Sequence, residues 1–242
     1  MKRAGIVSLI MMIICFGAGC ASAAKAALRT QKDPIALVSV VSNDDINWKG
    51  EDSIDPKTAG YFTNRTLRAD PDLAIISKAD QLINSADKLI RDTLADSGVI
   101  NLADKETVFR SRSYQDARLN KYQINREQLK PDDYRFIDYR DKNFPPALAT
   151  ETGIRRSMYV EFVFTKSMAT GIGKNGSGRA SLDMTLFVLN DLGKRIYRKT
   201  YSLGSRSTMK VSLGVYSHSE LISLFEEAIV DACYDFLDDL DT

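Results

Sequence analysis

The longest apolar run of the chain lies at its amino end. Two basic residues, Lys2 and Arg3, precede a nearly unbroken apolar stretch over residues 5–16. This arrangement is typical of a bacterial secretory signal peptide, and the run is too short for a retained membrane span. We therefore expect an exported protein that loses residues 1–19.

Beyond the signal, the apolar positions of the first half predict a strand, a helix and a second strand in turn. Residues 35–41 are apolar on both faces, as in a central strand. Across residues 70–97 apolar positions recur every three or four residues, which predicts a helix capped by Asp70 and ended by Gly98. A short strand over residues 99–102 would complete a right-handed βαβ unit with parallel strands.

The second half predicts an antiparallel meander followed by a long helix. Residues 159–166, 180–189 and 195–203 alternate with period two, and Gly193 suits the positive φ of the second hairpin turn. Residues 217–240 carry a broad apolar stripe behind the capping box of Ser217 and Glu220. The last turn of this helix is acidic and opposes the helix dipole, so we expect it to fray.

The segment between these halves is polar and aromatic. We expect a helix over residues 113–122, a short edge strand over 134–139 and one or two helical turns over 147–152. The predicted fold class is α/β (α+β): a mixed sheet of about five strands, with a βαβ start, an antiparallel meander and helices packed on the sheet. Residues 34–242 are expected to form a single domain.

The signal ends in a motif that resembles a lipobox. Cys20 follows the small residues Ala18 and Gly19, so we expect lipidation of Cys20 and a tether over residues 20–33. A strong lipobox has Leu where this chain has Gly17. A rival cleavage site before Ala24 would release a soluble protein, and an uncleaved anchor is the third alternative.

Composition excludes some classes of partner. The 33 Lys and Arg residues balance 32 Asp and Glu residues, so no long-range attraction to nucleic acid or to an anionic membrane is expected. Basic and aromatic residues alternate over 110–140, but acidic residues lie among them, which indicates a solvated face. Cys233 falls in the apolar stripe of the last helix and is predicted to be a buried, unpaired cysteine.

Motifs for catalysis are weak. Residues 171–176 match G-x-G-x-x-G, but they lie between two strands instead of opening a helix, so we expect a flexible hairpin loop and no dinucleotide site. His218 is the only histidine and has no nucleophile signature nearby. We therefore predict no catalytic residue, no cofactor and no metal site.

Two segments are candidates for contact with a partner. The polar stretch 42–69 follows the carboxyl end of a strand and holds the only tryptophan, so it is either a lid or a surface loop with Trp48 packed on the core. The glycine-rich hairpin over residues 171–178 is the second. The candidate contact residues are Asn43, Asp44, Asp45, Trp48, Gly173, Lys174 and Asn175.

The order of elements, with the stretches ADSGVINLAD and LDMTLFVLNDLGKRIYRKTYSL, resembles a periplasmic α/β domain. This domain occurs in curli-secretion lipoproteins, in the amino-terminal part of the Tol-system propeller protein and in lipoprotein activators of penicillin-binding proteins. The resemblance covers residues 34–240 as a pattern and transfers no binding residue.

The resemblance implies a non-enzymatic, lipid-anchored protein of the bacterial cell envelope, at the outer membrane or the periplasmic face. Such a protein would bind an envelope protein partner as an assembly or regulatory factor. The alternatives are a carrier of a small ligand or lipid and a soluble secreted hydrolase.

Overall fold

A computed structural model describes residues 25, 28–29, 33–49, 70–75, 77–172 and 175–241. Its centre is a long antiparallel hairpin of β5 (Arg156–Ile172) and β6 (Asn175–Asn190). The two strands pair from Arg156 opposite Asn190 to Ile172 opposite Asn175. The strand predicted over residues 180–189 is therefore longer at both ends, and the glycine-rich residues 175–178 continue its pairing with β5.

Shorter strands pair with both outer edges of the hairpin, two in succession along each edge, and complete a seven-stranded mixed sheet. On one side, β1 (Ile35–Ser42) and β2 (Asp45–Trp48) both run parallel to β5. On the other side, β7 (Arg195–Gly204) and β8 (Met209–Val211) run antiparallel to β6. The predicted mixed α/β sheet is confirmed. The remaining strands are β4 (Ser77–Lys78) beside β2, and β3 (Leu73–Ala74) paired with β9 (Tyr216–Ser217) in a separate ladder.

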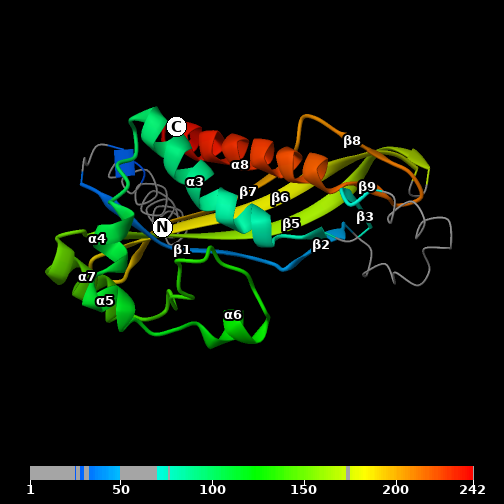
Figure 1. The fold of residues 1–242 in the computed structure, drawn as a ribbon. Coiled ribbons are helices and arrows are strands. Elements are labelled where there is room, and N and C mark those ends of the chain that lie inside the picture. Colours follow the sequence, from blue (N-terminus) through cyan, green and yellow to red (C-terminus); the bar gives the residue numbers. More distant parts are fainter. Residues whose placement is uncertain are drawn as a thin grey trace, which may run out of the picture.

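Two long helices, α3 (Asp80–Ser97) and α8 (His218–Asp241), lie side by side on one face of the sheet (Figure 1). The apolar stripe of α8 meets the sheet through Phe225, whose ring centroid lies 5.1 Å from that of Phe164. Phe236 packs edge-on to Tyr197 at 5.5 Å. Among the helices of the described residues, none combines the length and hydrophobicity that a bilayer crossing needs.

The second face of the sheet is only partly covered. The segment from 104 to 153 lies below β1 in Figure 1, while β7 exposes alternate residues on this face. The hydroxyls of Thr185 and Thr200 hydrogen bond across its open part at 2.8 Å. The covering segment contains α4 (Lys105–Phe109), α5 (Arg112–Gln115), α6 (Lys121–Asn125) and α7 (Phe144–Thr152).

The predicted start of the first long helix is wrong. α3 begins at Asp80, because the preceding residues form β3 and β4 instead of helix. Asp72 is used elsewhere: its carboxylate accepts hydrogen bonds from the Ser219 amide at 2.8 Å and the Ser217 hydroxyl at 2.6 Å. It therefore caps α8. The predicted end is confirmed, since Gly98 takes a left-handed conformation with φ 65°.

Three minor elements also differ from prediction. The expected strand over 99–102 is reduced to one parallel bridge, between Leu102 and Ile35, and the expected strand over 134–139 to a bridge between Ile137 and Leu119. The expected helix over 113–122 is broken into α5 and α6. Ser111 and Asn120 each cap a new helix start, which explains the break.

The last turn of α8 does not fray as expected. The helix continues to Asp241, and Leu240 is buried. The Asp239 carboxylate accepts hydrogen bonds from Lys25 at 3.1 Å, Lys199 at 2.5 Å and the Tyr197 hydroxyl at 2.6 Å. These partners from other elements offset the unfavourable position of an acidic residue at a helix carboxyl end.

Candidate functional site

The polar stretch 42–69, expected to be either a lid or a surface loop, forms β2 over residues 45–48. Its residues 50–69 lie outside the described residues. The Asn43 amide group bonds to both the backbone N–H and the carbonyl of Phe164, at 2.7 and 2.9 Å. Asp44 and Asp45 form ion pairs with Lys78 at 2.5 and 2.8 Å. These side chains join β2 to its neighbours, and their contact with a partner stays a prediction.

Trp48 is buried in the body of the protein. Its ring lies 5.3 Å from the ammonium group of Lys166, which also lies 5.0 Å from the Tyr216 ring and donates to the Ile46 carbonyl. Trp48 also lies near Gly178, so the two predicted contact segments meet here. Asn175 accepts a hydrogen bond from the Leu213 amide at 2.8 Å. The other candidates, Gly173, Lys174 and Cys20, lie outside the described residues.

The ring of His218 bonds to a buried serine. Its Nδ1 lies 2.9 Å from the hydroxyl of Ser77, which is buried and also bonded to the Tyr216 hydroxyl at 3.1 Å. Ser77 is 2% exposed, so its hydroxyl has almost no contact with solvent in this structure. Within the part of the chain that the structure describes, no group of three or more His, Cys, Asp or Glu residues could hold a metal ion.

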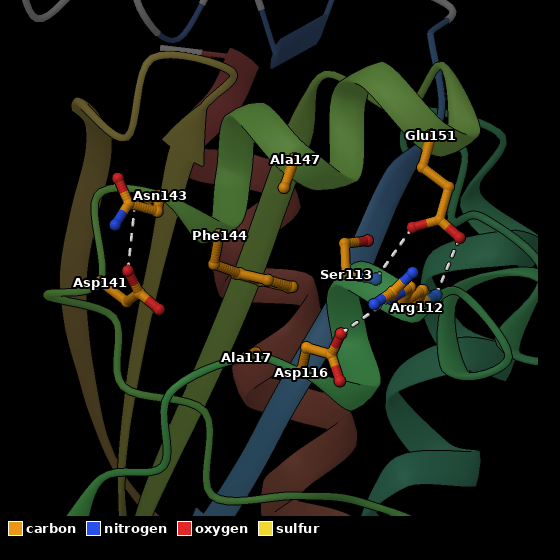
Figure 2. A pocket seen from close by; sticks show the side chains of 9 residues that line it. All are labelled: Arg112, Ser113, Asp116, Ala117, Asp141, Asn143, Phe144, Ala147 and Glu151. Atoms are coloured by element: carbon orange, nitrogen blue, oxygen red, sulfur yellow. Dashed lines mark hydrogen bonds and ion pairs between the residues drawn. The ribbon is translucent and has the colours of Figure 1, made fainter.

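A shallow hollow of about 410 Å³ lies between α5 and α7. Figure 2 shows that its polar groups bind one another: the Glu151 carboxylate accepts the backbone N–H groups of Arg112 and Ser113, both at 2.8 Å. These bonds hold the pKa of Glu151 below its usual range. Arg112 pairs with Asp116 at 3.1 Å. This network stabilises the start of α5 and leaves few groups for a ligand.

A second hollow, of about 270 Å³, lies on the open face of the sheet beside the β6–β7 turn. Its wall is aromatic: the rings of Phe187 and Tyr159 stack 4.9 Å apart, and Tyr139 meets Phe187 edge-on at 5.0 Å. We call this site the cationic hollow. Its lining residues are Tyr139, Arg140, Lys142, Glu161, Phe187, Leu189, Gly193, Arg195 and Arg198.

The charges of the cationic hollow are mostly uncompensated. Arg140 is paired with Asp138 at 2.9 Å. Lys142, Arg195 and Arg198 are exposed, and among the described residues no carboxylate lies within ion-pair distance of them. Of the described residues that line it, one is acidic, Glu161. Guanidinium groups bind carboxylates through paired hydrogen bonds, so the site suits an anionic group next to a flat apolar one.

Sequence reasoning missed the cationic hollow. Tyr139 and Arg140 belong to the basic and aromatic stretch that we assigned to a solvated face, whereas Arg195 and Arg198 lie on a strand about 55 residues later. The available signal was the period-two pattern, which places Phe187 and Arg198 on outward positions of paired strands. Their register, with Phe187 opposite Arg198, brings these segments together.

No protein-family model and no curated protein sequence matches the chain. Two solved structures are weakly similar to the chain. The LpoB C-terminal domain from Salmonella enterica is 13% identical, with a TM-score of 0.26 over 69% of this chain and 84% of that one. The hypothetical protein CT253 from Chlamydia trachomatis is 13% identical, with a TM-score of 0.28 over 72% and 73%. Similarity this low carries no argument about function.

Proposed function

We propose that this chain is a lipid-anchored protein of the bacterial cell envelope that binds an acidic segment of a partner protein and catalyses no reaction. The observation that carries partner binding is the cationic hollow, where three cations have no ion pair among the described residues and lie beside an aromatic wall. The proposed anchor is a diacylated Cys20 at the end of the secretory signal.

The chemistry of the cationic hollow favours binding over catalysis. In the described part of the chain, its lining offers one carboxylate and no serine, cysteine or histidine. Its volume of about 270 Å³ is at the lower limit for small-ligand sites, so it fits one or two side chains of a peptide segment. Aspartate or glutamate would pair with Arg195 and Arg198, and an adjacent apolar side chain would contact Tyr139.

Partner binding is tested by photo-crosslinking in living cells. p-Benzoylphenylalanine replaces Leu192, which is exposed on the β6–β7 turn next to Gly193, a lining residue of the hollow. We expect a crosslinked product whose attached peptide is acidic. The double variant Arg195→Glu/Arg198→Glu should reduce its yield at least about tenfold, because opposite charges become like charges at the contact.

The matched control is Lys88→Glu/Lys210→Glu. Both lysines are exposed, have no ion pair among the described residues, and give the same change in net charge. This control should retain the crosslink. An equal yield from both double variants, or an attached peptide without acidic residues, would contradict binding at the cationic hollow.

The anchor is tested separately by labelling cells with a clickable palmitate analogue. We expect label on the wild-type protein and none on Cys20→Ala, together with a mature amino terminus at Cys20. An unlabelled product that begins at Ala24 would show soluble export instead.

A further inference from the structure

The segment between Cys20 and the domain is not a free tether along its whole length. Lys25, Leu28 and Arg29 are helical, and the Leu28 side chain is buried with 1% of its surface exposed. Lys25 pairs with Asp239 at 3.1 Å, and Arg29 pairs with Asp241 at 3.1 Å. We call these three residues the docked segment. Two ionic contacts hold it against the carboxyl-terminal turn of α8, and Leu28 belongs to the hydrophobic core.

The docked segment also approaches the carboxyl end of α3. Arg29 lines a hollow of about 730 Å³ together with Ala95 and Gly98, at the end of that helix, and Lys105. Figure 1 shows the carboxyl ends of α3 and α8 at the same end of the molecule, with the β5–β6 hairpin tip at the opposite end. The docked segment therefore marks one end of the elongated domain.

The chain from Cys20 to Lys25 is short. Five residues span at most about 18 Å when fully extended. A lipidated Cys20 would therefore keep the docked end of the domain within about 18 Å of the bilayer surface. The β5–β6 hairpin tip lies much further from the anchor. β5 starts at Arg156, whose guanidinium donates to the Asp33 carbonyl, and its 17 residues extend about 50 Å to Ile172.

We propose that the docked segment fixes the orientation of the domain on the membrane, with the carboxyl-terminal end of α8 facing the bilayer and the β5–β6 hairpin tip pointing away. This inference rests on the lipid anchor of the proposed function. It goes further by assigning a membrane-facing end to the domain. It also places the cationic hollow in the half of the domain nearer the membrane, because Arg195 and Arg198 lie at the start of β7, where Tyr197 bonds to Asp239 of α8. The partner would then present its acidic segment close to the bilayer.

Energy transfer on reconstituted vesicles tests the orientation. The lipoprotein is purified from membranes, its lipid is verified by intact mass, and it is inserted into phosphatidylcholine vesicles that carry an acceptor dye on a lipid headgroup. A donor dye is attached to Asp238→Cys on α8 or to Ile172→Cys at the hairpin tip, two exposed positions. Cys233 stays unlabelled because burial raises the pKa of its thiol to about 12.

We expect donor quenching at residue 238 to exceed that at residue 172 at least about threefold. The variant Lys25→Glu/Arg29→Glu places each glutamate next to an aspartate, so the docked segment should detach and the two sites should give similar quenching. Detachment exposes Leu28 and should lower the thermal stability somewhat, but the body should stay folded, because Asp239 retains Lys199 and Tyr197. The matched control is Lys88→Glu/Lys210→Glu, which should keep the difference.

The outcomes separate the two proposals. A protein with the mass of an unlipidated chain overturns the anchor and, with it, the orientation. A lipidated protein with equal quenching at residues 238 and 172 leaves the anchor intact and overturns the orientation alone. Unchanged quenching in Lys25→Glu/Arg29→Glu would show that the docked segment does not set the orientation.

Discussion

Asp87 shows how a single buried charge can join two parts of this fold. It lies on α3, and its carboxylate binds Arg91 at 2.9 Å, Lys105 at 2.8 Å and the Tyr134 hydroxyl at 2.5 Å. Burial would raise the pKa of Asp87, but the hydrogen bonds from Lys105 and Tyr134 and the charge of Arg91 hold it below its usual value. The ionised carboxylate thus links α3 to the segment that covers the second face of the sheet.

Removal of this carboxylate should destabilise the protein strongly. In Asp87→Ala the groups of Arg91, Lys105 and Tyr134 lose a common partner, so the free energy of unfolding should fall by about 3 kcal/mol. Urea denaturation measures this change. Asp92→Ala, on an exposed position of the same helix, should change stability by less than about 0.5 kcal/mol. Equal effects of the two variants would contradict this role of Asp87.

At the scale of elements, the hydrophobic periodicity correctly predicted the helix and hairpins that depend only on local sequence patterns. The meander and α8 follow from local apolar patterns and from the capping box, in which the Glu220 amide donates to the Ser217 hydroxyl at 3.0 Å. The start of α3 was mispredicted because Asp70 and Pro71 imitate a helix start. The competing bonds of Asp72 to the start of α8 join residues about 145 positions apart, and no local pattern contains them.

The cap from Asp72 is therefore expected to stabilise α8 instead of α3. Asp72→Ala should lower the free energy of unfolding by about 1 kcal/mol, a typical value for the loss of a helix cap. Amide hydrogen exchange should rise first at Ser219 and Glu220, in the first turn of α8. Asp96→Ala, an exposed position on α3, is the matched control and should leave exchange in α8 unchanged. Faster exchange at the start of α3 alone would contradict this assignment.

At the scale of the whole molecule, the sequence predicted the mixed sheet with helices packed on it, whereas the export signal stays a prediction because residues 1–24 lie outside the described residues. The sequence did not predict how distant segments meet. The cationic hollow combines residues from a loop, from β5 and β6 and from β7, and the docked segment meets a helix more than 200 residues later. Such contacts depend on strand register and helix placement, which a one-dimensional pattern specifies only weakly.

Asp239 is the residue where three distant parts of the chain converge, and its ionisation should couple them to pH. Burial would raise its pKa, but hydrogen bonds from Lys199, Tyr197 and Lys25 lower it to about 2. The unfolded chain then binds a proton more readily than the folded protein. The stabilisation is therefore complete above the ordinary aspartate pKa and is lost as the pH falls from about 4 towards 2.

The variant Asp239→Asn removes this charge at every pH. Its deficit in the free energy of unfolding, relative to wild type, should be largest at about pH 7 and should shrink as the pH falls from about 4 to 2, because the wild-type carboxylate is then neutral as well. Urea denaturation at a series of pH values measures the deficit. Asp238→Asn is the control, since this neighbour is exposed and its substitution should give a small deficit at all pH values. A deficit of Asp239→Asn that stays constant with pH would mean that the ion pairs of Asp239 do not hold the docked segment, β7 and α8 together.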